Sequence, residues 1–169
     1  MIYPIVKYGD PVLETPAADV TEFGDKLQKL VDDMFESMYE AQGVGLAAPQ
    51  IGISLRLSVI DVSFKEDPEA KLVLANPEIL HMEGKQGGHE GCLSIPDFRE
   101  NLSRAQKVTI RAQDVNGNWY EKTGEDLLAR AFQHEIDHLD GVLFIFRMSA
   151  LKRSLNLRKI RKMQSEGSW

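Results

Sequence analysis

The chain has 169 residues, 43% of them hydrophobic, so it can bury the core of one domain and has no room for a second of ordinary size. Its net charge of -6 argues against general binding to nucleic acid, and no apolar run approaches the roughly 20 residues of a membrane span. A single cysteine cannot form an internal disulfide, and the first residues lack the features of a signal peptide. We therefore expect one domain over residues 1–169, a cytoplasmic location, and neither membrane nor DNA partners.

The first predicted element is a helix over residues 25–42. Hydrophobic side chains recur at helical spacing from Leu27 to Ala41. A stripe of methionine and aromatic residues with this spacing is usually core. The pattern therefore predicts an amphipathic helix that packs one face against the interior.

The middle of the chain is typical of antiparallel strands. Segments rich in β-branched and aromatic residues lie at 55–62, 72–80, 107–113 and 119–122. Asn116-Gly117 predicts a hairpin turn between the last two segments. Pro96 is expected to end any strand that runs through Gly91.

The segment His134-Glu135-Ile136-Asp137-His138 carries the most informative pattern in the chain. Two histidines four residues apart project from one face of a helix, with a glutamate beside the first of them. An apolar run precedes the motif, and Gly141 follows it as a signal that ends the helix. We therefore expect a largely buried helix. The pattern predicts a metal site with His134 and His138 as ligands and Glu135 as the general base.

A catalytic metal usually takes three protein ligands, so a third must come from outside the motif. The metzincin pattern would place a histidine at position 144, where this chain has Phe144. A thermolysin-like glutamate would have to be Glu166, which lies in a terminal segment where chains fray. Both downstream options are therefore weak.

Cys92 is the better third ligand. A lone cysteine is usually a buried small hydrophobe, but the histidine motif favours a ligand role here. A thiolate binds a borderline-soft divalent ion better than the neighbouring His89 or Glu90 does. The expected set is Cys92, His134 and His138. The histidines outside the motif, His81 and His89, are expected on the surface.

A last helix is predicted over residues 149–164. Residues 151–169 carry six basic side chains and one acidic one, a net charge of +5, so the rest of the chain carries -11. This pattern fits either a solvated helix face or a docking surface. Residues 149–169 would form a basic C-terminal helix and tail of the same domain. Helices near both ends with strands between them indicate an α+β fold.

Three ordered motifs together resemble the peptide deformylases. They are Gly43-Val44-Gly45-Leu46-Ala47-Ala48-Pro49-Gln50, Glu90-Gly91-Cys92-Leu93-Ser94 and Gln133-His134-Glu135-Ile136-Asp137-His138. The similarity covers residues 2–150, with departures at Glu14 and at Gly87-Gly88-His89. The resemblance implies antiparallel β-sheets wrapped around a central helix that carries the histidine motif. It also implies metal-dependent hydrolysis of the N-formyl group from formyl-methionyl nascent peptides, with release of formate.

The resemblance implies roles for individual residues. It assigns the Gln50 amide and the Leu93 backbone N–H to the oxyanion of the formyl group, although the sequence alone fits Gln50 equally well as a cap of the glycine-rich turn. It points to Gly45 for main-chain pairing with an extended substrate. The other candidate substrate-binding residues are Val44, Glu90, Arg99, Leu127 and Ala131, with Val44, Leu127 and Ala131 suited to an apolar pocket for methionine.

The residues do not identify the ion, because a Cys-His-His set suits Zn²⁺ and Fe²⁺ alike. The resemblance favours Fe²⁺, with Zn²⁺, Ni²⁺ or Co²⁺ as substitutes. The alternatives are a general metallopeptidase, against which the missing third histidine argues, and a noncatalytic binding protein. Because formyl groups must be removed as chains emerge, the ribosome is a candidate partner for the basic helix.

Overall fold

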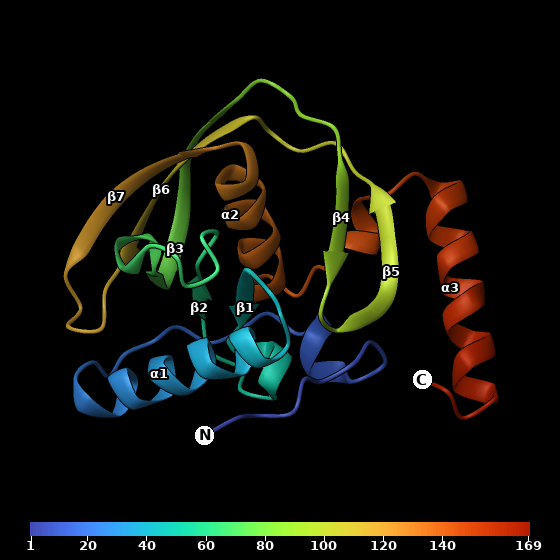
Figure 1. Ribbon diagram of the computed structural model, residues 1–169, viewed down its shortest axis with the longest axis horizontal. Helices are drawn as coiled ribbons and strands as arrows, with labels where there is room; N and C mark the ends of the chain where they lie inside the picture. The colour runs from blue at the N-terminus through green and yellow to red at the C-terminus, as the bar shows by residue number, and fades with distance from the viewer.

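The computed structural model describes the whole chain, residues 1–169, and Figure 1 shows its antiparallel sheets and three α-helices. The helices are α1 (Asp25–Glu40), α2 (Asp126–Leu139) and α3 (Ala150–Ser165). The larger sheet has the strand order β1-β2-β3-β6-β7 and consists of β1 (Gly45–Ala47), β2 (Leu57–Ile60), β3 (Leu72–Glu83), β6 (Lys107–Gln113) and β7 (Trp119–Glu125). The smaller sheet pairs β4 (His89–Cys92) with β5 (Ile95–Asn101). The predicted α+β class, with antiparallel sheets around the motif-bearing helix, is confirmed.

Helix α2 lies at the centre of the molecule (Figure 1), and every residue from Ala129 to Leu139 is buried. Phe132 and Ile136 pack against Val108 and Ile110 of β6 in one hydrophobic cluster. Each such side chain contributes about 1.5–3 kcal/mol when it leaves water, so the helix is fixed firmly against the larger sheet. This burial holds the histidine motif in one position.

The end of α2 depends on a glycine. Gly141 has a φ of +80°, a conformation that residues with a side chain rarely adopt. A Cβ at this position would also lie 2.9 Å from the carbonyl oxygen of Glu14. The predicted stop at Gly141 is therefore explained both by backbone conformation and by space.

Helices α1 and α3 cover other parts of the core. Met34 and Met38 of α1 are fully buried, as the stripe of hydrophobic residues predicts. In α3 only Ile160 among the apolar side chains is fully buried, whereas Leu151 and Leu155 are exposed. The basic helix is therefore attached to the core along a narrow line.

Several predicted boundaries shift in the structure. Helix α1 ends at Glu40 instead of residue 42, because Gln42 takes a positive φ of 59°. Strand β7 continues to Glu125, since it pairs with β6 along its whole length. The sequence pattern does not predict β1, β4 or β5.

The prediction that Pro96 ends a strand is wrong. Pro96 is the second residue of β5. The register shifts between the pairs Gly91↔Arg99 and Cys92↔Ile95, so Pro96 falls in an irregular part of the ladder. A proline is tolerated there because no regular ladder hydrogen bond is required of it.

Strands β1 and β4 each have an edge without a neighbouring strand. β1 is the first strand of the larger sheet, and β4 pairs only with β5. Residues of both strands line one cavity, so two free edges face the same space. None of the three helices is long and apolar enough to cross a membrane.

Candidate metal centre

Helix α2 and strand β4 bring three potential ligand atoms together. One ligand atom each from Cys92, His134 and His138 lies within 4.8 Å of the other two. His138 Nε2 is 3.3 Å from Cys92 Sγ and 3.1 Å from His134 Nε2. Bonds of ordinary length in a tetrahedral zinc-type site would hold such atoms about 3.3–3.6 Å apart. The donor set and its spacing therefore fit a divalent ion.

Glu90 fixes the orientation of the first histidine. Its Oε2 lies 2.7 Å from His134 Nδ1, and the Nε2 of the same ring lies 3.1 Å from His138 Nε2, on the side of the other candidate ligands. Nδ1 of His138 has no hydrogen-bond partner in the protein. The two histidines are thus oriented unequally by the protein.

Glu90 belongs to a buried network of charges. Its carboxylate accepts hydrogen bonds from Arg104 at 2.7 and 3.0 Å and from Arg130 at 2.8 Å. Arg104 also pairs with Asp137, at 2.8 Å. Burial by itself would raise the pKa of Glu90, but the hydrogen bonds from His134 and Arg104 outweigh it and hold the pKa well below the ordinary value.

This network changes the interpretation of Glu90. The sequence prediction counts it among the substrate-binding residues, but the structure places it behind His134 and not in the lining of the cavity. Its side chain is only 4% exposed. Glu90 therefore orients a candidate ligand, and both of its oxygens are already engaged by Arg104, Arg130 and His134.

Of the two acidic residues that line the cavity, Glu135 is the buried one. It is 3% exposed, it lines the cavity, and its Oε1 has no hydrogen-bond partner in the protein. Burial raises the pKa of Glu135 to about 7. A carboxylate with such a pKa can both accept and return a proton near neutral pH.

Gln50 takes the capping role, and its amide nitrogen lies beside the candidate ligands. Its Oε1 accepts a hydrogen bond from the Ala47 backbone N–H at 3.0 Å and so caps the turn after β1. Its Nε2 lies 3.7 Å from Cys92 Sγ and 3.2 Å from Ser94 Oγ. The amide donor is therefore held beside the ligand set by its own carbonyl group.

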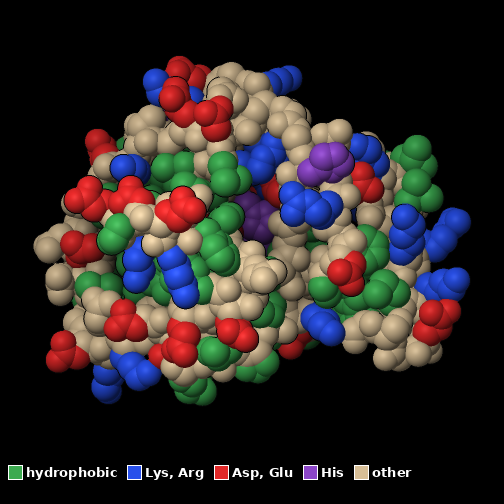
Figure 2. All heavy atoms as spheres, viewed as in Figure 1, with side chains coloured by type: hydrophobic (Ala, Val, Ile, Leu, Met, Phe, Trp, Pro, Cys, Tyr) green, Lys and Arg blue, Asp and Glu red, His purple; other side chains and the backbone are tan.

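The cavity beside these residues has a volume of about 670 Å³. Of the predicted site residues it is lined by Val44, Gly45, Gln50, Cys92, Leu93, Arg99, Leu127, Ala131, His134 and Glu135. Glu90 and His138 lie behind the wall. In Figure 2 the hollow has a histidine side chain (purple) at its floor, and a second histidine and basic side chains (blue) lie beside its rim.

Sequence reasoning missed two arginines of the site. Arg130 lies four residues before His134, on the same face of α2, and this spacing was a usable signal. Arg104 comes from the loop before β6, and no local pattern indicates that it reaches Glu90 and Asp137. His89, expected on the surface, is exposed and also lines the cavity, while His81 is exposed elsewhere.

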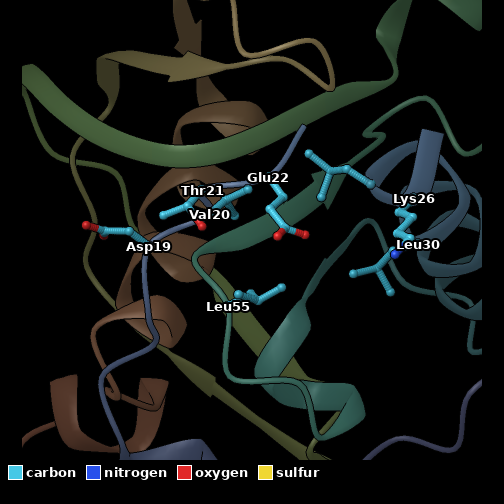
Figure 3. Close-up of a pocket in the computed structure, with 8 residues that line it drawn as sticks. Asp19, Val20, Thr21, Glu22, Lys26, Leu30 and Leu55 are labelled. Carbon is cyan, nitrogen blue, oxygen red and sulfur yellow. The ribbon is translucent and has the colours of Figure 1, made fainter. Parts of the chain in front are cut away.

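A second hollow lies away from this centre. Figure 3 shows Glu22 of the loop before α1 and Lys26 and Leu30 of α1 around it, with Leu55 opposite. It has a volume of about 220 Å³, contains neither cysteine nor histidine, and shares no residue with the larger cavity. The chemistry therefore belongs to the larger cavity.

Comparisons with known proteins agree with this geometry. The family model described as polypeptide deformylase matches residues 2–154. The chain is 70% identical over 169 residues to a peptide deformylase of Acidobacterium capsulatum, a match that covers 100% of this chain and 99% of the relative. The crystal structure of a peptide deformylase from Legionella pneumophila has 46% identity and a TM-score of 0.91, covering 99% of this chain and 98% of that one.

A second solved structure, the peptide deformylase of Thermus thermophilus, has 45% identity and a TM-score of 0.88, covering 95% of this chain and 94% of that one. The matches extend over nearly the full length and include both the motif-bearing helix and the cavity. The chain therefore belongs to the peptide deformylase family, metal-dependent hydrolases that remove the N-formyl group from nascent peptides.

Proposed function

We propose that Cys92, His134 and His138 hold a divalent ion, and that Glu135 and Gln50 complete the machinery that hydrolyses formyl-methionyl peptides. One observation carries this assignment. Three ligand atoms converge beside a buried, unpartnered carboxylate that faces a cavity large enough for a peptide. This combination supports the hydrolysis of an amide.

The thiolate and two imidazoles suit a borderline-soft divalent ion, and we propose Fe²⁺ as the native one, with Zn²⁺, Ni²⁺ or Co²⁺ as substitutes. When bound, the ion acts as a Lewis acid and lowers the pKa of water toward about 7. Glu90 supports the site by fixing the His134 ring. Such supporting partners typically change metal affinity by about 10–100-fold.

Glu135 is the proposed general base and acid. It accepts the proton of the water that attacks the formyl carbon, and it later donates that proton to the amine nitrogen as the C–N bond breaks. Formate and a free α-amine are the products. A pKa of about 7 matches this double role, because the Glu135 carboxyl must be deprotonated before the water attacks and protonated afterwards.

Gln50 and the Leu93 backbone N–H are the proposed donors to the formyl oxygen, which becomes negative when water adds. Gln50 Nε2 is held beside Cys92, and Leu93 follows that ligand directly in the chain. Donors held in place in this way need not reorganise as the charge develops. Losing one such donor typically costs about 10²–10³ in rate.

The substrate is proposed to bind as an extended strand between the free edges of β1 and β4. Gly45 of β1 and Gly91 of β4 both line the cavity and allow main chain to approach closely. Val44, Leu127 and Ala131 line the same cavity and supply apolar surface for the methionine side chain. The formyl group would then lie at the end of β4 that carries Cys92.

We further propose that α3 docks on the ribosome and that the enzyme acts in the cytoplasm, where formylated chains emerge. Ile160 attaches the helix to the core, while Lys159, Arg161 and Lys162 are exposed. Exposed basic side chains on one helix suit a phosphate backbone. The charge pattern of the tail is what supports this assignment.

The test of the activity is release of formate from formyl-Met-Ala-Ser, with the products resolved by chromatography. We expect formate and Met-Ala-Ser in equal amounts. Cleavage of an internal peptide bond would instead identify a metallopeptidase. Absence of a bound ion in protein prepared with metal would indicate a noncatalytic protein.

A further inference from the structure

The wall formed by β4 and β5 carries two exposed side chains that the mechanism does not use. His89 and Arg99 both line the cavity, and neither side chain forms a hydrogen bond or an ion pair within the protein. These two residues are therefore free to meet a substrate.

Arg99 is held against the wall of the cavity. It is paired across the sheet with Gly91, and a Cβ on Gly91 would lie 3.3 Å from Arg99 Cγ and 3.5 Å from its Nη1. The arginine side chain therefore lies over the glycine, and its guanidinium stays close to the strand edge that faces the substrate. A guanidinium presents its N–H donors in a planar fork that matches the geometry of a carboxylate.

The other charged groups of the lining are already engaged or lie elsewhere. Arg130 donates to Glu90 at 2.8 Å, and Glu135 lies at the reacting position. Asp97 is exposed two residues from Arg99 but forms no ion pair with it. The basic side chains that remain available at this rim are thus Arg99 and His89.

The direction of β4 relates this rim to the substrate. A formyl group at Cys92 leaves the following residues to run along β4 toward His89, which is three residues away. At about 3.3 Å per residue this is a distance of about 10 Å. A substrate residue two or three positions after the methionine therefore lies beside His89 and Arg99.

We propose that His89 and Arg99 form a cationic rim that selects substrates with an acidic side chain two or three residues after the formyl-methionine. This inference rests on the proposed function, since it requires the formyl group at the metal centre. Arg99 offers a fixed positive charge, and His89 offers an N–H donor even when neutral. A lysine at the same substrate position meets a like charge instead.

The experiment compares matched peptides in which one position is varied: formyl-Met-Ala-Glu-Ser, formyl-Met-Ala-Gln-Ser and formyl-Met-Ala-Lys-Ser. With the holoenzyme we expect kcat/KM to fall in the order Glu, Gln, Lys, by about two- to fivefold a step, the size of one exposed ion pair. The difference should lie mainly in KM and shrink at high salt. Arg99→Gln should reduce the ratio between the Glu and Lys peptides.

Two further variants keep the test decisive. His89→Glu, at an exposed position, should reverse the order of the Glu and Lys peptides even if Arg99→Gln does not fold. Lys122→Gln on β7 removes one positive charge from an exposed residue outside the cavity, and should leave the ratio unchanged. Deformylation of all three peptides at equal kcat/KM would overturn the rim proposal alone. If none of the three peptides is deformylated, the proposed function is overturned instead.

Discussion

Gly45 faces Glu135 so closely that a Cβ on residue 45 would lie 2.5 Å from Glu135 Oε2. The same added carbon would lie 3.0 Å from Glu135 Cδ and 3.2 Å from its Cγ, so the whole end of the side chain would have to move. The glycine is therefore needed by the proposed base as well as by the substrate. This explains why two distant motifs meet at one point of the cavity.

Gly45→Ala should displace the Glu135 carboxylate and lower kcat by about 10²-fold, since a shift of about 1 Å at a reacting group costs that much. The atoms nearest to the added methyl group all belong to Glu135 and none to a metal ligand, so the metal content should stay unchanged. Steady-state kinetics and elemental analysis of the same preparation check both points. Wild-type kcat in the alanine variant would show that Glu135 need not occupy this place.

Cys92→Ala should release the ion. The two remaining imidazoles come from one helix, and a structural or catalytic site of this type normally uses at least three protein ligands. Elemental analysis after dialysis should therefore find the variant depleted of metal while the wild type retains it. A full complement of metal in the variant would remove Cys92 from the ligand set.

Glu90→Gln should destabilise the fold and weaken the metal site together. The change leaves the buried Arg104 and Arg130 without a full counter-charge, which typically costs about 3–5 kcal/mol. It also weakens the hydrogen bond that orients the His134 ring, which should lower metal affinity by about 10–100-fold. Denaturant unfolding and competition with a chelator measure the two effects.

A matched control is Glu83→Gln. Glu83 pairs with Lys107 at 3.6 Å, but its side chain is 54% exposed, so its loss should change the free energy of unfolding by no more than about 0.5 kcal/mol. Equal effects of the two substitutions would show that the network around Glu90 has no special role.

Reversal of charge at Lys159, Arg161 and Lys162 should weaken cosedimentation with ribosomes without altering turnover of a short peptide. Binding of the wild type should fall steeply as salt increases, since contacts to phosphates release counterions. Because Ile160 keeps its buried contact, the thermal stability of the variant should stay close to that of the wild type.

The same reversal at exposed lysines outside α3, Lys26, Lys85 and Lys122, serves as the control. It should leave ribosome binding of the protein much less affected. If the α3 variant binds as well as the wild type at matched ionic strength, the tail is only a solvated helix face.

The sequence predicts best where one element contains its own signal. Helix α2 combines helical periodicity, two histidines on one face and a stop at Gly141, and all of these are local. The hairpin between β6 and β7 is predicted for the same reason, with Asn116-Gly117 in its turn. Predictions fail where the determining contacts are distant.

Strand β4 and the arginine network illustrate that failure. β4 has four residues, one of them glycine, and it is stabilised by pairing with β5 and not by its own pattern. Arg104 pairs with Glu90 and Asp137, which are 14 and 33 residues away in the chain. No local pattern indicates such pairs, so the position of Glu90 behind His134 becomes visible only in the fold.

The role of Glu135 is tested most directly by Glu135→Gln, measured for metal content and for kcat on formyl-Met-Ala-Ser in one preparation. The substitution keeps the size of the side chain and removes its ability to accept a proton. We predict that the metal stays bound and that kcat falls by about 10²–10⁴-fold. A variant that keeps its metal and turns over at nearly the wild-type rate would contradict the assignment of Glu135 as the base.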